Sequence, residues 1–78
     1  MTTMERVQQV VASALRVPIE KLVPTALLYQ VAELDSLTLA EIAAALDDEF
    51  RIRLPSDGIT NAHSIADLAA LVDATVAR

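Results

Sequence analysis

Hydrophobic residues recur at helical spacing in three stretches of the chain, and the first begins close to residue 2. Thr2 and Glu5 have the spacing of a capping box, in which each side chain accepts a backbone N–H from the other residue. The apolar positions of this stretch are Met4, Val7, Val10, Val11, Ala14 and Leu15. Because the residue before a proline is pushed out of helical conformation, the pattern predicts a helix that ends before Pro18.

The second stretch opens at Asp35, a residue type that commonly caps helices, and it predicts a helix from Ser36 to about Phe50. Its core-facing positions fall within about 100° of arc on a helical wheel. They are Leu39, Ile42, Ala43, Leu46 and Phe50. The opposite side holds Leu37, Glu41, Ala44 and Asp48. An apolar side chain framed by acids on an exposed face is the usual layout of a docking site.

The third stretch begins at Ser64, with Asp67 three residues later in capping-box spacing. Its expected buried positions are Ile65, Leu68, Leu71, Val72 and Val76. Residues 51–55 alternate charged and apolar side chains, but no second strand signal exists for them to pair with. We therefore expect an extended linker there, followed by a turn or one short helical turn at residues 55–58.

The connection over residues 18–34 is long for a small domain, so we expect it to pack on the core. Its apolar anchors are Ile19, Leu22, Leu27, Leu28 and Val31, and the ring of Tyr29 is expected to pack on the bundle with its hydroxyl in water. The elements together predict an all-α fold. We expect residues 1–78 to form one domain, a small antiparallel bundle of three main helices plus one short helix.

Composition narrows the possible chemistry of the chain. It has 78 residues, no cysteine and one histidine, His63, so disulfides, thiolate metal sites and His-rich sites are excluded. Only Tyr29 and Phe50 are aromatic, and the core must therefore be aliphatic. The apolar runs are far shorter than the roughly 18 residues of a membrane-spanning helix. With no basic and hydrophobic leader at its start, the chain is expected to be cytoplasmic.

Charge is concentrated in one segment. The formal net charge is −5, and residues 33–50 hold six acids and no Lys or Arg. Such a field attracts basic partners and works against nucleic acid or anionic membranes, so neither is expected as a partner. Asp47 and Asp48 do not form a metal site on this reasoning, because adjacent helical side chains point about 100° apart.

Ser36, at the start of the second predicted helix, is the strongest candidate for a residue that takes part in a reaction. A serine hydrolase would need a positioned base and an oxyanion hole, and neither a nearby histidine nor a Gly-x-Ser-x-Gly turn is present. Taken alone, Asp35 and Ser36 are better explained as helix-capping residues, which is among the commonest uses of both residue types. The surrounding pattern decides between these readings.

That pattern extends over nearly the whole chain. Asp35-Ser36-Leu37 opens a helix that continues with Glu41-Ile42, Ala45-Leu46 and an acidic ending, and is followed by Ile52-x-Leu54-Pro55 and a helix opening at residues 64–68. The chain thus resembles an acyl carrier protein of the phosphopantetheine-carrier family. The resemblance implies that Ser36 receives a 4′-phosphopantetheine arm from coenzyme A through a separate phosphopantetheinyl transferase, and that the thiol of the arm carries acyl groups as thioesters.

The resemblance also implies the partners and their contacts. Basic patches on the transferase and on acyl-loading and acyl-processing enzymes would dock on Leu37, Glu41, Ala44, Asp47 and Asp48, with Asp35 and Leu37 flanking the attachment serine. The protein would be a monomer without catalysis of its own. Glu33 stands where the family commonly has glycine, and Thr38 and Ala44 also depart from its pattern. These departures favour a specialised pathway, such as polyketide, lipopeptide or modified-lipid synthesis, over housekeeping fatty-acid synthesis.

Two alternatives stay open at this point. The chain could be an aminoacyl or peptidyl carrier, loaded by a dedicated adenylating enzyme. It could also be a helical adaptor that keeps the fold and is never modified, in which case Ser36→Ala would leave its function unchanged.

Overall fold

The computed structural model describes residues 2–77, and its regular elements in this range are helical. In chain order they are α1 (Thr3–Leu15), the 3-10 turn η1 (Ile19–Lys21), α2 (Leu28–Val31), α3 (Ser36–Phe50), α4 (Ser56–Asn61) and α5 (Ile65–Val76). The predicted all-α bundle is confirmed, with five α-helices in place of four. Residues 51–55 form no strand.

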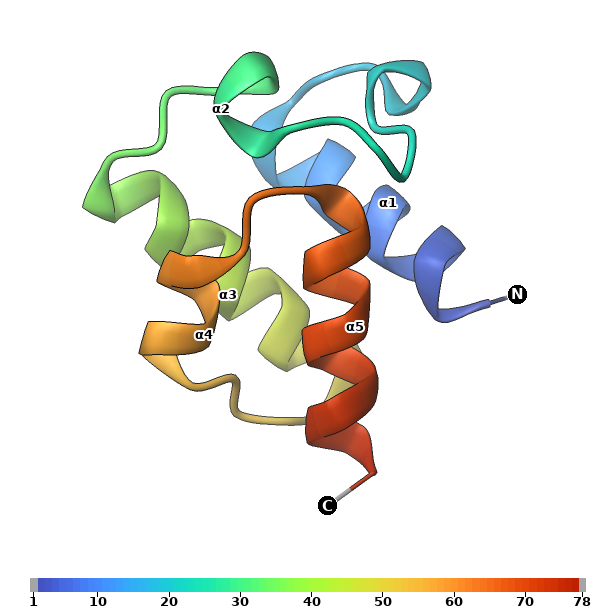
Figure 1. Cartoon of the computed structure of the whole chain (residues 1–78), viewed down its shortest axis with the longest axis vertical. Coiled ribbons are helices and arrows are strands. Elements are labelled where there is room, and N and C mark those ends of the chain that lie inside the picture. The colour runs from blue at the N-terminus through green and yellow to red at the C-terminus, as the bar shows by residue number, and fades with distance from the viewer. Residues whose placement is uncertain (1, 78) are drawn as a thin grey trace.

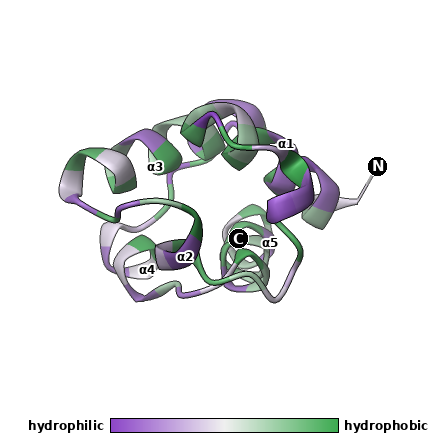
Figure 2. Ribbon diagram, turned by 90° about the horizontal axis from the view of Figure 1, so that it is seen from above, coloured by the Kyte–Doolittle hydropathy of each residue, from purple (hydrophilic) through white to green (hydrophobic). Residues whose placement is uncertain are grey.

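The three long helices make the body of the protein. α1 packs against both α3 and α5. In Figure 1, α3 descends from the left of the view and α5 descends to the C-terminus, whereas α1 rises from the N-terminus at the right. Seen from above, α1 and α3 lie along one side, and α2, α4 and α5 lie along the other (Figure 2).

The core is aliphatic, as the composition requires. Its fully buried side chains come from all three long helices and from the first connection: Val7, Val11, Leu22, Leu28, Ile42, Leu46, Ile65, Leu68 and Val72. Among the described residues no charged or polar side chain is buried. The fold therefore depends on tight aliphatic packing between amphipathic helices, because burial of apolar surface is the main favourable term available to a chain this small.

The three long helices begin at the residues predicted from the sequence, to within one position. Thr2 and Glu5 form the predicted capping box of α1, and Ser64 and Asp67 form that of α5. The carboxylates of Glu5 and Asp67 accept backbone N–H groups, and these hydrogen bonds lower the pKa of both side chains. α3 spans Ser36–Phe50, as its pattern predicts.

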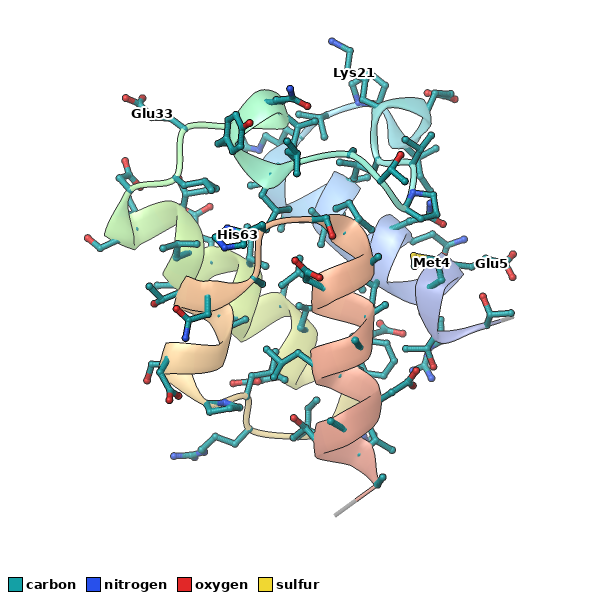
Figure 3. The ribbon with its side chains drawn as sticks, in the orientation of Figure 1. Met4, Glu5, Lys21, Glu33 and His63 are labelled. Carbon is teal, nitrogen blue, oxygen red and sulfur yellow. The ribbon has the colours of Figure 1, made fainter. Side chains whose placement is uncertain are left out.

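The connection between α1 and α3 is held at several points. Gln8 Nε2 donates to the Leu22 carbonyl at 2.7 Å, joining α1 to the turn after η1. Residues 24–28 also pair with the start of α5: Leu28 N–H donates to the His63 carbonyl at 2.9 Å, and Ile65 N–H donates to the Ala26 carbonyl at 3.1 Å. Figure 3 shows Lys21 and Glu33 reaching away from the protein at the two ends of this connection.

Three burial predictions are wrong. Ile19 is 41% exposed, because the tight η1 turn directs Leu22 rather than Ile19 to the core. Tyr29 is 63% exposed, since α2 is a single turn whose buried position is taken by Leu28. Val76 is 54% exposed, because it lies in the last turn of α5, one turn beyond the buried Val72.

α4 is longer than the predicted turn at residues 55–58. It has no side-chain cap, and Gly58 allows it to approach α5 closely: a Cβ at this position would lie 2.9 Å from Leu71 Cδ1. Glycine disfavours a helix, so this element depends on its contacts with α3 and α5. A local sequence pattern does not indicate such contacts between helices, so the second half of α4 was not predicted.

Both α1 and α3 end on an arginine in the left-handed conformation, Arg16 with φ 58° and Arg51 with φ 55°. This conformation costs a residue with a Cβ roughly 1–2 kcal/mol, and glycine adopts it without that cost. Replacing Arg16 by glycine should therefore raise the free energy of unfolding by about 1 kcal/mol, net of the greater entropy of the unfolded chain. Urea unfolding in 0.2 M salt would measure it.

Arg53→Gly is the matched control for this prediction. It removes the same charge from an exposed position that has no positive φ, so it should give no gain in stability. An Arg16→Gly variant no more stable than Arg53→Gly would contradict the proposed strain.

Candidate functional site

The site is built on the first turn of α3. The Asp35 backbone is extended, with φ −83° and ψ 174°, and its Oδ1 accepts the Thr38 N–H at 2.8 Å. Its carbonyl accepts the Leu39 N–H at 3.0 Å. These two bonds begin the helix at Ser36, as expected for an aspartate N-cap.

Ser36 is exposed, and within residues 2–77 its side chain has no hydrogen-bond partner. As the first residue of the helix, it lies beside backbone N–H groups that have no acceptor inside α3. These N–H groups and the helix dipole favour a negative charge at this end. A phosphate ester on the Ser36 oxygen would therefore be electrostatically favoured, and its exposure leaves room for an arm.

A groove extends from Ser36 between α3 and α4. It has a volume of about 240 Å³, and its walls are formed by Ser36, Leu39, Ala40, Ala43, Ser56, Ile59 and Thr60. Most of these side chains are apolar, and the two alanines keep the α3 wall low. The groove was not predicted, because its second wall is α4, whose position depends on tertiary contacts.

The predicted docking residues divide into two groups. Leu37, 67% exposed, shares an exposed face of α3 with Glu41, Ala44 and Asp48, within about 60° of arc at 100° per residue. Asp47 lies about 80° from Leu37 on the same wheel and is half-buried. Its Oδ1 accepts the Leu54 N–H at 2.9 Å.

One acid in the last turn of α3 has a partner that the sequence did not reveal. Glu49 forms an ion pair with Arg6 of α1, 3.1 Å between Oε2 and the guanidinium, and the same guanidinium lies 4.3 Å from the centre of the Phe50 ring. The residues are 43 positions apart in the chain, so no local pattern could indicate this contact.

Glu33 and Thr38 line one hollow beside the start of α3. It has a volume of about 550 Å³ and lies between the end of α1 and the start of α3, where Arg16, Asp35 and Glu41 also line it. Both side chains therefore contribute to the surface near Ser36. Within residues 2–77, no three His, Asp or Glu side chains lie close enough together to hold a metal ion.

Comparison with known proteins identifies the family of this chain. Residues 5–72 match the family described as "Phosphopantetheine attachment site". The chain belongs to the acyl carrier protein family. The family implies a covalently attached 4′-phosphopantetheine cofactor, and its members interact with phosphopantetheinyl transferases and acyl-processing enzymes.

Individual relatives of this carrier cover most of its length. The acyl carrier protein of Thermosynechococcus vestitus is 31% identical over 74 residues, which are 95% of this chain and 91% of that protein. The acyl carrier protein of Saccharopolyspora erythraea is 32% identical over 74 residues, 95% of this chain and 78% of that protein. That of Zymomonas mobilis is 28% identical over 71 residues, 91% of each.

No helix in the described part of the carrier is long and apolar enough to cross a membrane.

The cap of α3 should make the stability of the carrier depend on pH. The Thr38 N–H holds the pKa of the Asp35 carboxyl below its ordinary value. The stability that this charge adds is fully present above the pKa of the unfolded chain, about 4, and is lost as the pH falls through the lower pKa of the folded state. The difference in unfolding free energy between the wild type and Asp35→Ala should therefore narrow as the pH falls from 6 to 2.5.

Asp35→Asn is the control, because an asparagine oxygen caps a helix without a charge. Its stability relative to Asp35→Ala should change little over this pH range. Urea unfolding at each pH would measure both differences, and a constant gap between wild type and Asp35→Ala would contradict the role of the ionised carboxylate.

Proposed function

We propose that this carrier bears its 4′-phosphopantetheine arm on Ser36 and moves thioester-bound acyl intermediates between separate enzymes. The single observation that carries the assignment is the position of Ser36. It is the exposed first residue of α3, with a hydroxyl free to react, at the end of the helix that favours a phosphate. The family match covers this position.

The modification itself is chemically simple. The Ser36 oxygen forms a bond to the phosphorus that bears pantetheine, and the bond from that phosphorus to adenosine 3′,5′-bisphosphate breaks. The serine proton passes to a base on the transferase. The chain contains no thiol of its own, so the thiol of the arm supplies the acyl-carrying chemistry. The carrier contributes presentation and has no catalytic role in this proposal.

The groove beside Ser36 favours an acyl cargo over an aminoacyl one. Its walls are mainly the side chains of Leu39, Ala40, Ala43 and Ile59, and no charged residue lines it. A hydrocarbon chain that enters it removes apolar surface from water, whereas a charged amino group would lose hydration without meeting an opposite charge. Fatty-acid, polyketide and specialised-lipid pathways all supply hydrocarbon cargo. Glu33 and Thr38, beside the attachment position, support a specialised pathway among these.

Partner enzymes are proposed to dock on the exposed face of α3. Leu37 supplies an apolar contact, and Glu41 and Asp48 supply charges that basic patches can approach. An interface that relies on these few side chains suits a carrier that must dissociate after each step, because transient interfaces are small. We propose that the carrier acts as a cytoplasmic monomer.

Modification of Ser36 is the decisive test. The carrier is incubated with coenzyme A and a broad-specificity phosphopantetheinyl transferase, and intact-protein mass spectrometry measures the product. The wild type should gain one phosphopantetheine, and Ser36→Ala should gain none.

Ser56→Ala is the matched control, since Ser56 is also the exposed first residue of a helix and lines the same groove. It should be modified like the wild type. A folded wild type that stays unmodified with several transferases would favour the unmodified adaptor over the carrier.

The docking proposal predicts a charge effect on the same reaction. Glu41→Lys combined with Asp48→Lys should lower kcat/KM for the transferase about tenfold at low salt, because two exposed attractions become repulsions. Added salt should shrink the effect, since it screens exposed charges. Asp73→Lys, on the exposed side of α5, is the control and should change kcat/KM little. Equal rates for all variants at low salt would contradict docking on α3.

A further inference from the structure

Asp47 accepts three hydrogen bonds from the segment that joins α3 to α4. Its carbonyl accepts the N–H groups of Arg51 and of Ile52, the latter at 3.1 Å. Its carboxylate accepts the N–H of Leu54 at 2.9 Å. One residue in the last turn of α3 therefore determines the course of the chain through residue 54.

The charge of Asp47 is poorly placed for stability by itself. A carboxylate near the C-terminus of a helix is opposed by the helix dipole, and Asp48 and Glu49 follow directly. Since the side chain is half-buried and turned away from the face that holds Leu37, a basic partner that docks on that face meets Asp48 first. The presence of an aspartate at position 47 is therefore explained better by its hydrogen bond from the Leu54 N–H than by its charge.

The hydrogen bond to Leu54 acts on α4. Leu54 is buried, 7% exposed, and the residue after it, Pro55, precedes the first residue of α4. α4 has only six residues and no side-chain cap, so it is not stable as an isolated helix. Its position depends on this anchor at its start and on the contact of Gly58 with Leu71.

α4 in turn supplies one wall of the groove that begins at Ser36. Ser56, Ile59 and Thr60 face Leu39, Ala40 and Ala43 across it. The distance between the two walls is therefore set, at the end remote from Ser36, by the segment that Asp47 holds.

We propose that Asp47 is a positioning residue for the cargo groove: by accepting the Leu54 N–H, its carboxylate holds α4 at the spacing from α3 that admits the apolar part of an acyl chain. This role replaces partner docking for Asp47, and it rests on the proposed function of the groove and of Ser36. It requires an acceptor oxygen at this position and does not require a charge.

Three variants separate the acceptor from the charge. Asp47→Asn keeps an acceptor oxygen and removes the charge, Asp47→Ala removes both, and Asp47→Glu keeps the charge and displaces the oxygen by one methylene. Asp48→Asn is the control, because it removes the neighbouring charge from an exposed side chain. Each protein is loaded by a broad-specificity transferase with octanoyl-coenzyme A, and mass spectrometry confirms a single octanoyl-phosphopantetheine before further measurement.

Two properties of the loaded proteins are then measured under conditions where urea unfolding shows all of them folded. The first is hydrogen exchange of the α4 amides, with the α5 amides as an internal reference. The second is the rate at which hydroxylamine cleaves the octanoyl thioester, with octanoyl-coenzyme A as the unprotected reference.

In Asp47→Ala, exchange in α4 should rise about tenfold relative to α5, because the anchoring hydrogen bond is lost. Thioester cleavage should accelerate towards the rate of octanoyl-coenzyme A. Asp47→Asn and Asp48→Asn should match the wild type in both measurements, and Asp47→Glu should lie between the wild type and Asp47→Ala. If Asp47→Ala does not fold, the contrast between Asp47→Asn and Asp47→Glu still tests the proposal.

The proposal is overturned if Asp47→Asn is impaired as strongly as Asp47→Ala or Asp47→Glu, since charge would then be the relevant property. It is also overturned if Asp47→Ala matches the wild type, or if the wild-type thioester is cleaved as fast as octanoyl-coenzyme A. Failure of the carrier function itself gives a different result, because the wild type would then take up no octanoyl-phosphopantetheine.

Discussion

The hydrogen bond between Asp35 and the Thr38 N–H fixes the residue at which α3 begins, and the rest of the site depends on that residue. An α-helix leaves its first N–H groups without internal partners, and a side chain just before the helix must accept one of them. With Asp35 in this position, Ser36 becomes the first helical residue and stays exposed, while Leu39 and Ile42 turn towards the protein. A start displaced by one residue would rotate these side chains by about 100° relative to the cap.

Local signals of this kind explain why much of the fold could be predicted. The caps at Thr2, Asp35 and Ser64 each involve residues no more than three positions apart, so the sequence pattern predicted the starts of all three long helices. The exposed position of Leu37 followed from helical periodicity alone. The elements that were missed, η1, α2 and the second half of α4, have weak local signals. They are held by contacts between distant segments, such as the Leu28 N–H to the His63 carbonyl and the approach of Gly58 to Leu71.

The site divides along the same line. Ser36 and the face of α3 around Glu41 depend on one helix, so the cap and helical periodicity were enough to place them, and the resemblance of the surrounding sequence to carrier proteins identified Ser36 as the candidate. The groove depends on two helices, and its second wall was out of reach of any single periodic pattern. The same limit applies to Asp47, which sequence spacing grouped with Asp48 although the fold turns it towards Leu54. Adjacent acids on a helix look equivalent in a sequence and face different surroundings once the next segment has packed.

The acids of residues 33–50 therefore act at two ranges. Asp35 is engaged in the cap, Asp47 in the turn after α3 and Glu49 in the pair with Arg6. Within residues 2–77, Glu33, Glu41 and Asp48 have no ion-pair partner and are available for direct contact. All the ionised carboxylates of the segment still contribute to the electrostatic field that attracts a basic enzyme, and the positive charge of Arg6 offsets part of this field. Salt screens the field at distances beyond about 8–10 Å. Long-range attraction thus comes from the whole segment, whereas the geometry of the docked complex depends on the few acids that the fold leaves free.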